Sequence, residues 1–298
     1  MVLLAKKRPK INDPRRKSNC SDVQRKKNQT KIMKKFLSVL LICILFSACS
    51  EYQRALKSED AGLKFDAAVA QYEKGKYNKA IRLFEQIAPA YRGKPQAEKM
   101  FFLYAQSYYK TGQYYLAGYQ FESFASSYPK SEKLEEASFL GAKSFSMLSP
   151  VFSLDQVDTV KAISKLQTFI DNYPNSEYFA EANATLKTLT DKLERKSFEV
   201  AKGYNTILDY KSAIVALDNF VADYPGTIYK EEALYYKFDS AYKLAMNSVP
   251  SKVEERLNNA KIAHANLMKF SVATSHKEEA DKMLSKIEQD LQQYNKQQ

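Results

Sequence analysis

The sequence of 298 residues carries a formal net charge of +12, from 46 Lys and Arg against 34 Asp and Glu. Thirteen of these cations but only two of the acids lie in residues 1–35, so the rest of the chain has a net charge of +1. A high pI usually indicates a nucleic-acid or anionic-lipid partner, but here the basic charge is confined to one end. The composition therefore argues against nucleic acid, with a basic arm at residues 6–31 as the alternative.

Residues 33–48 have the parts of an export signal. Lys34 and Lys35 precede thirteen uncharged residues, Phe36 to Ala48, and the small pair Ser47-Ala48 stands directly before Cys49. A permanent membrane span needs about 20 apolar residues, so this stretch is too short for one. An ordinary secretory signal with a chance cysteine is the alternative reading.

The order of these residues resembles the lipobox of bacterial lipoproteins, although Phe46 stands where that pattern prefers Leu. The resemblance implies that Cys49 is acylated, with palmitate as one chain, and becomes the mature N-terminus. Ser50, in place of Asp, implies an outer-membrane destination. Residues 1–32 are then a basic leader, and we hypothesise that it comes from a start codon placed too early. Residues 49–60 form a lipidated tether, and residues 61–295 form the folded part. Removal of the leader and signal leaves Cys49 as the only cysteine, so no disulfide is expected within the chain.

Three segments of the mature chain align without gaps and end in Tyr-Pro: Phe121–Pro129, Leu166–Pro174 and Leu217–Pro225. Each begins with a large apolar residue, which has a Phe three residues after it and an Ala four residues before it. Those alanines are Ala117, Ala162 and Ala213, and Ala80 with Phe84 begins an earlier, less regular copy. Such internal similarity is typical of a solenoid.

The spacing gives each repeated residue a physical role. Residues four and three apart share one face of a helix, so the Ala, the apolar residue and the Phe predict a helix with one buried side. Tyr-Pro ends that helix, because Pro lacks an N–H and restricts the residue before it. Ser131, Ser176 and Thr227 follow each Pro by two residues and are expected to cap the next helix.

Residues 105–129 resemble the tetratricopeptide repeat (TPR) almost position for position, with Ala105, Tyr108, Gly112, Ala117 and Pro129 at its marker positions. The repeat alanines are 37, 45 and 51 residues apart, more than the usual period of about 34. The later copies therefore carry insertions, predicted as a loop from Pro150 and as one long helix from about Glu177 to Thr206. The predicted fold is an all-α, TPR-like α-solenoid of about five helical hairpins, closed by a capping helix at about 277–294.

The signal, the cysteine followed by "SEYQRALKS", five such repeats and the insertion "SPVFSLDQ" together resemble the BamD family. Its members are lipoproteins of the outer-membrane β-barrel assembly (BAM) machinery. The resemblance implies a scaffold facing the periplasm. It implies binding of the POTRA region of BamA through the C-terminal repeats, and of unfolded outer-membrane proteins through the N-terminal repeats.

Projecting the groove positions of the repeat onto the first two copies predicts a peptide groove rich in aromatic side chains, which would suit an extended aromatic peptide. The alternative is that several of these residues belong to the core. The predicted groove residues are Phe65, Val69, Tyr72, Lys99, Phe102, Gln106, Tyr109 and Lys110.

The mature sequence gives no sign of an enzyme. It has two histidines, His264 and His276, and the spacing places His264 at a core position of the last repeat. No Gly-rich phosphate loop and no metal-ligand spacing is present, so no catalytic residue, metal or cofactor other than the lipid is expected. The rival functions are a TPR scaffold lipoprotein of division or peptidoglycan machinery and a SusD-like glycan-uptake protein, although the chain lacks the Trp typical of sugar platforms.

Overall fold

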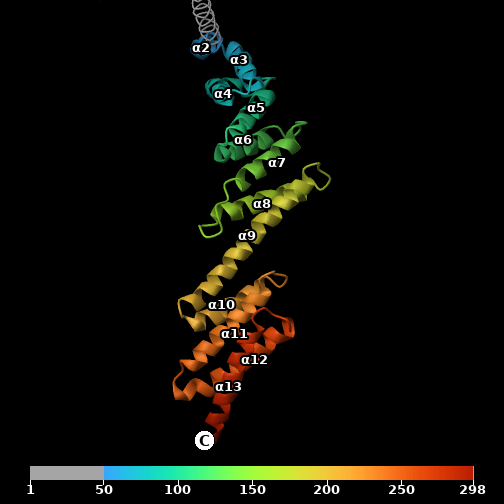
Figure 1. The fold of residues 1–298 in the computed structure, drawn as a ribbon. Coiled ribbons are helices and arrows are strands. Elements are labelled where there is room, and N and C mark those ends of the chain that lie inside the picture. The colour runs from blue at the N-terminus through green and yellow to red at the C-terminus, as the bar shows by residue number, and fades with distance from the viewer. Residues whose placement is uncertain (1–49, 298) are drawn as a thin grey trace, which may run out of the picture. The chain divides into compact units, whose positions relative to one another are not determined.

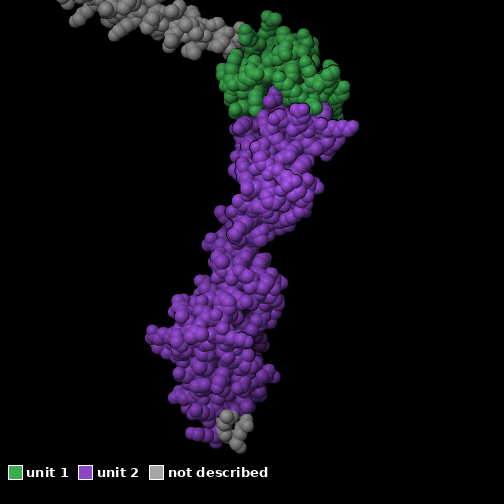
Figure 2. All heavy atoms as spheres, turned by 90° about the vertical axis from the view of Figure 1, so that its right-hand side faces the viewer, with its two compact units in different colours: residues 1–100 green, residues 101–298 purple. Residues whose placement is uncertain are grey.

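The computed structural model describes residues 50–297, and all regular structure in this part of the chain is helical (Figure 1). Residues 1–32, the signal at 33–48 and Cys49 lie outside the described residues. The chain divides into two compact units, residues 1–100 and 101–298 (Figure 2). None of the described helices is long and apolar enough to cross a bilayer.

In the first unit, helix α2 (Ser50–Lys57) precedes the hairpin of α3 (Ala61–Glu73) and α4 (Tyr77–Tyr91), and α5 (Ala97–Lys110) starts there. Asp60 starts α3, because its Oδ1 accepts hydrogen bonds from the N–H groups of Gly62 and Leu63 at 2.8 and 3.3 Å. The core of the hairpin includes Phe65 and the predicted repeat residues Ala80 and Phe84, all buried.

The second unit contains most of α5 and the remaining helices in hairpin order. Neighbouring helices pack on one another from α6 to α13. These helices are α6 (Tyr114–Ser127), α7 (Leu134–Ser146), α8 (Val157–Asn172), α9 (Phe179–Thr206), α10 (Tyr210–Asp223), α11 (Lys230–Met246), α12 (Pro250–Phe270) and α13 (Lys277–Gln297). The prediction of five hairpins and a final helix is therefore confirmed.

The repeated residues occupy the positions that their spacing predicted. The repeat alanines of α6, α8 and α10 have no exposed surface, and the phenylalanines seven residues later (Phe124, Phe169 and Phe220) are buried. Each of these helices stops at the Tyr before its Pro, and the N–H of that Tyr donates to the carbonyl of the Phe at 2.9 Å.

The predicted capping by Ser131, Ser176 and Thr227 is wrong in its position. Each hydroxyl accepts from the N–H two residues later, at 2.9 to 3.0 Å, but the following helix begins only after that residue. The residues that actually start the helices have no side-chain cap. The hydroxyls thus stabilise the turn that leads into the helix.

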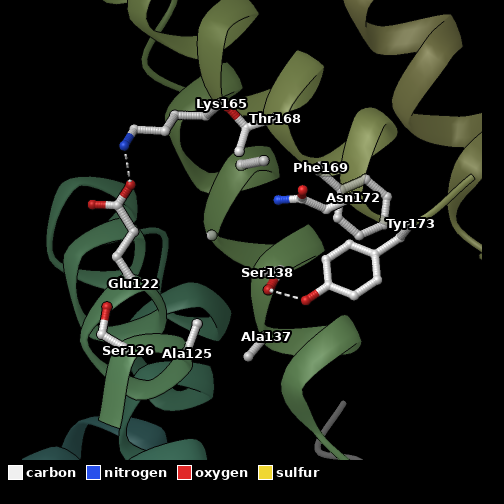
Figure 3. A pocket seen from close by; sticks show the side chains of 12 residues that line it. Glu122, Ala125, Ser126, Ala137, Ser138, Lys165, Thr168, Phe169, Asn172 and Tyr173 are labelled. Atoms are coloured by element: carbon white, nitrogen blue, oxygen red, sulfur yellow. Dashed lines mark hydrogen bonds and ion pairs between the residues drawn. The ribbon is translucent and has the colours of Figure 1, made fainter. Parts of the chain in front are cut away.

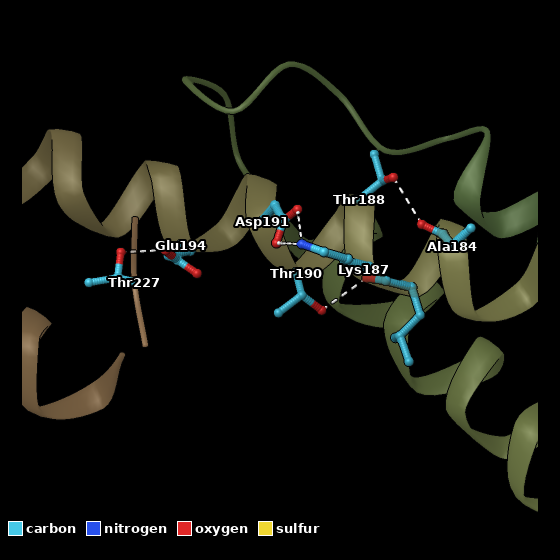
Figure 4. A network of polar contacts seen from close by, with 8 residues as sticks. Ala184, Lys187, Thr188, Thr190, Asp191, Glu194 and Thr227 are labelled. Atoms are coloured by element: carbon cyan, nitrogen blue, oxygen red, sulfur yellow. Dashed lines mark hydrogen bonds and ion pairs between the residues drawn. The ribbon is translucent and has the colours of Figure 1, made fainter. Parts of the chain in front are cut away.

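Helix α9 confirms the predicted long helix and joins two separate cores. Its first half contributes Ala182 and Leu189 to a core shared with α7 and α8, and its second half contributes Phe198 and Ala201 to a core shared with α10 and α11. Between these cores its exposed side is polar (Figure 4): Lys187 pairs with Asp191 at 2.8 Å. The Glu194 carboxylate accepts a hydrogen bond from the Thr227 hydroxyl.

Candidate functional site

The predicted lipid site, Cys49, lies outside the described residues, but the segment after it is structured. Tyr52 and Ala55 of α2 are buried, and the Lys79 ammonium group lies 4.9 Å from the centre of the Tyr52 ring. Helix α2 packs on α3. Most of the stretch expected to be a tether is therefore a helix attached to the first unit.

The predicted groove residues of the first unit differ in exposure. Phe65 is buried and stacks on Tyr91 with ring centres 5.3 Å apart, so it belongs to the core. Val69 and Tyr72 are half-buried, and Lys99 is exposed. The Tyr72 ring meets the edge of Tyr77 at 5.3 Å.

In the second unit Phe102 is also a core residue. Its ring lies 5.4 Å from Phe124 and 6.1 Å from Phe121. Phe139 and Phe198 hold the same place in α7 and α9, each 5.5 Å from the phenylalanine of the following helix. The expectation that Phe65 and Phe102 line an open groove is thus corrected, because the repeat uses an aromatic at this position to fill the space between its two helices.

In α5 and α7, the residue four positions after this phenylalanine is polar and contacts the first helix of the next repeat. Gln106 donates to Glu136 of α7 at 3.1 Å, and Lys143 pairs with Glu181 of α9 at 2.5 Å. We call this set the first-helix ladder. Sequence analysis found Gln106 but missed Lys143, although the matching position in the next copy would have indicated it.

The ladder continues between α9 and α11. The Asn205 amide donates to the Asp239 carboxylate and to Ser240, both at 2.8 Å, and Lys243 donates to the same carboxylate at 2.7 Å. Asp239 is buried, and these donors replace the hydrogen bonds to water that its carboxylate loses on burial.

Lys143 is the best defined cation of the ladder. Burial opposes its charge, but the hydrogen bond to Glu181, with a further contribution from Tyr109, outweighs burial and raises the pKa of the ammonium group. Tyr109 is half-buried, and Lys110 beside it is exposed. This face therefore offers a fixed cation, carboxylate and amide acceptors and an aromatic ring, which suits an extended peptide with aromatic side chains.

Both histidines pack against aromatic rings. His264 is buried against Phe238, as its spacing predicted, and its Nε2 lies 3.5 Å from Asp281, too far for a good hydrogen bond. His276 stacks on Tyr235 at 3.8 Å, and burial, together with the hydrogen bond to Glu279, raises the pKa of the Tyr235 hydroxyl. Within residues 50–297, no group of three His, Cys, Asp or Glu side chains could hold a metal.

A cavity of about 380 Å³ lies between α6, α7 and α8 (Figure 3). Small side chains such as Ala125 and Ala137 line it. Lys165 and Glu122 pair beside it at 2.6 Å, and Tyr173 lies 3.5 Å from the hydroxyl of Ser138. Sequence analysis did not predict this cavity, because no single repeat contains it.

Comparison with known proteins gives a family. The model of the family described as "YfiO: Outer membrane lipoprotein" matches residues 58–257. Two crystal structures of a putative kinesin light chain with nearly identical TPR-like repeats from Podosopora anserina, one of them carrying a single substitution, are similar at 14% identity. The matches cover 79% of this chain and 95% and 97% of those chains, with a TM-score of 0.30. Because the TM-score is this low, these matches support no conclusion beyond the helical hairpins described above.

Proposed function

Because the chain belongs to the YfiO family of outer membrane lipoproteins, we propose that it is a non-catalytic, lipid-anchored scaffold of the outer-membrane β-barrel assembly machinery. The family match over residues 58–257 is the observation that carries this proposal. The scaffold binds the POTRA region of a BamA-type barrel subunit and unfolded outer-membrane proteins. No cofactor takes part besides the lipid on Cys49.

The anchor and the first unit support a position close to the membrane surface, which we place at its periplasmic face. A lipid on Cys49 would be followed within one residue by α2, which packs on the first repeat. No flexible tether of any length would then separate lipid and solenoid, so the first unit would lie close to the membrane surface.

The first-helix ladder supports binding of unfolded clients. An extended peptide has unpaired backbone groups. The Lys143 ammonium group and the Glu136 carboxylate, each held in place by a partner, can each make a further hydrogen bond with such groups. Tyr109 adds an aromatic surface beside Lys143.

The peptide site is tested with a ten-residue peptide that ends in phenylalanine, titrated against the acyl-free mature chain. Tyr109→Ala should weaken binding without changing the thermal midpoint, whereas Tyr115→Ala, an exposed tyrosine of α6, is the control. Phe102→Ala is unsuitable for this test, because loss of a core ring lowers stability as well. If a folded Tyr109→Ala variant binds the peptide as tightly as the wild type, the peptide does not bind at the first-helix ladder.

The function as a whole is tested by purification of the tagged chain from solubilised outer membranes. Recovery of the barrel-assembly subunit supports the proposal. Recovery of division or peptidoglycan proteins, or of a glycan transporter, in its place would favour the rival scaffolds.

A further inference from the structure

A second cavity, of about 240 Å³, lies between α10, α11 and α12. Helix α11 packs on both of the other helices, and Figure 1 shows the three next to one another. The cavity is larger than an engineered cavity of about 150 Å³ that binds benzene in another protein. Its walls are mainly apolar, and the apolar residues that form them are Ile214, Ala241, Leu244, Ile262 and Ala263.

The equivalent place in an earlier repeat is filled by the chain itself. Phe145 of α7 and Ala241 of α11 each come 16 residues after the Pro of the preceding Tyr-Pro stop, so they hold the same position. The Phe145 ring is 1% exposed and lies directly on Gly118, where an added Cβ would meet the ring at 2.9 Å. The Lys161 ammonium group lies 4.2 Å from the centre of the same ring. A large apolar group therefore closes this side of the repeat.

In the last repeat smaller side chains leave the place open. Ala241 replaces the phenylalanine, and Asn259 replaces the lysine, since Asn259 and Lys161 each come 12 residues before the residue that ends their helix. Ile214 stands in the position of the glycine and takes up part of the space, but the cavity remains. Its apolar walls would gain from a ligand that removes them from water.

The two ends of the cavity carry different polar groups. At one end Lys237 pairs with Asp218 at 2.5 Å, so this end is neutral. At the other end Arg256 donates to the hydroxyl of Ser248, just after α11, at 2.7 Å. Lys237 and Leu244 are seven residues apart in α11, so the cavity runs for about 10 Å between its ends.

The Arg256 end is cationic, because no acid neutralises it. The half-buried guanidinium group has five N–H donors, and within the described part of the chain no carboxylate pairs with it. Asp209 accepts from a serine hydroxyl of α10 at 2.7 Å, and Glu255 pairs with Lys252 at 3.2 Å. Glu254, two residues before Arg256, lies on the opposite side of α12.

We propose that this cavity binds a medium-chain carboxylic acid, an unbranched aliphatic chain that ends in a carboxylate. The chain covers the apolar walls, and the carboxylate accepts hydrogen bonds from Arg256. A neutral apolar ligand would leave the guanidinium group without an acceptor, and a small hydrophilic anion would leave the walls in contact with water. The cavity shares no residue with the first-helix ladder, and binding there does not depend on the scaffold function.

The experiment titrates octanoate into the acyl-free mature chain by calorimetry at neutral pH. Acetate lacks the chain and 1-octanol lacks the charge, so both should bind at least about tenfold more weakly than octanoate. Arg256→Met should weaken octanoate binding by at least about tenfold, because a hydrogen bond to a charged group is lost. The same variant should bind 1-octanol as the wild type does.

Two further variants test the walls. Ile214→Gly/Ala241→Phe rebuilds the closed arrangement of the earlier repeat and should abolish octanoate binding. Ile262→Ser should weaken it, whereas Val215→Ser is the matched control. Val215 is 61% exposed against 60% for Ile262 but does not line the cavity, so its variant should bind as wild type. Thermal unfolding followed by circular dichroism checks that each variant is folded.

Three outcomes would overturn the proposal. The first is the absence of octanoate binding by the wild type, and the second is acetate binding as tight as that of octanoate. The third is octanoate binding that a folded Ile214→Gly/Ala241→Phe variant and the Ile262→Ser variant both retain. None of these outcomes affects the scaffold function, which the purification from outer membranes tests separately.

Discussion

The residue Leu208 gives a prediction in which backbone strain and chain entropy act on stability in opposite directions. Its φ of +66° matches that of the glycines at the corresponding turns. Leu208→Gly removes backbone strain of about 1–3 kcal/mol but adds about 0.5–1 kcal/mol of chain entropy to the unfolded state. The exposed leucine side chain contributes little packing. We therefore expect a net stabilisation of about 1 kcal/mol.

The reverse change serves as the matched test. A Cβ added at Gly112 meets no atom within 4 Å, so Gly112→Leu introduces the same backbone strain without a clash. It should destabilise the chain by about the amount that Leu208→Gly gains. Leu208→Ala keeps the strain and removes most of the side chain, so it should leave stability nearly unchanged and isolate the backbone effect.

The assay is thermal unfolding followed by circular dichroism, since the chain contains no Trp. About 1 kcal/mol corresponds to a shift of about 2–4 °C in the thermal midpoint of a unit of this size. A lower midpoint for Leu208→Gly would show that the leucine packs usefully and would refute the strain argument.

Three further predictions concern the second unit. Phe198→Ala should lower the free energy of unfolding by about 3–5 kcal/mol, because it empties a fully buried site of the core, measured by urea titration; a loss below about 1 kcal/mol would contradict this. Asp239→Ala should lower the free energy of unfolding by about 3 kcal/mol, because it leaves the buried amide of Asn205 short of an acceptor. In the same urea titration, the double variant Asn205→Ala/Asp239→Ala should lose less stability than the two single variants lose together. Hydrogen bonds from Ser212 lower the pKa of Asp209. The stability that they add is therefore present above the unfolded pKa of about 3.9 and is lost as pH falls through the lower, folded value. The thermal midpoint of Asp209→Asn, measured between pH 2 and 6, should depend less on pH than that of the wild type.

The aromatic pattern shows how far sequence reasoning reached into the site. The spacing correctly placed Phe124, Phe169 and Phe220 in the core. It could not tell the core aromatic Phe102 from the half-buried Tyr109 seven residues later, because both lie on overlapping faces of one helix. Which of them is covered depends on the neighbouring helix, and sequence spacing within one repeat does not contain that neighbour.

The sequence by itself determined the order of the repeat helices and where α6, α8 and α10 end, because helix periodicity, the Tyr-Pro stops and the repeat alanines act within a few residues of chain. It also indicated the long helix at Phe179–Thr206. Only the tertiary structure decided that this helix serves two cores and that Lys192 and Lys196 hold the inserted loop beside it. The reason is physical: the Lys192 and Lys196 contacts join residues 42 positions apart, and the two cores form only when separate hairpins pack on one helix.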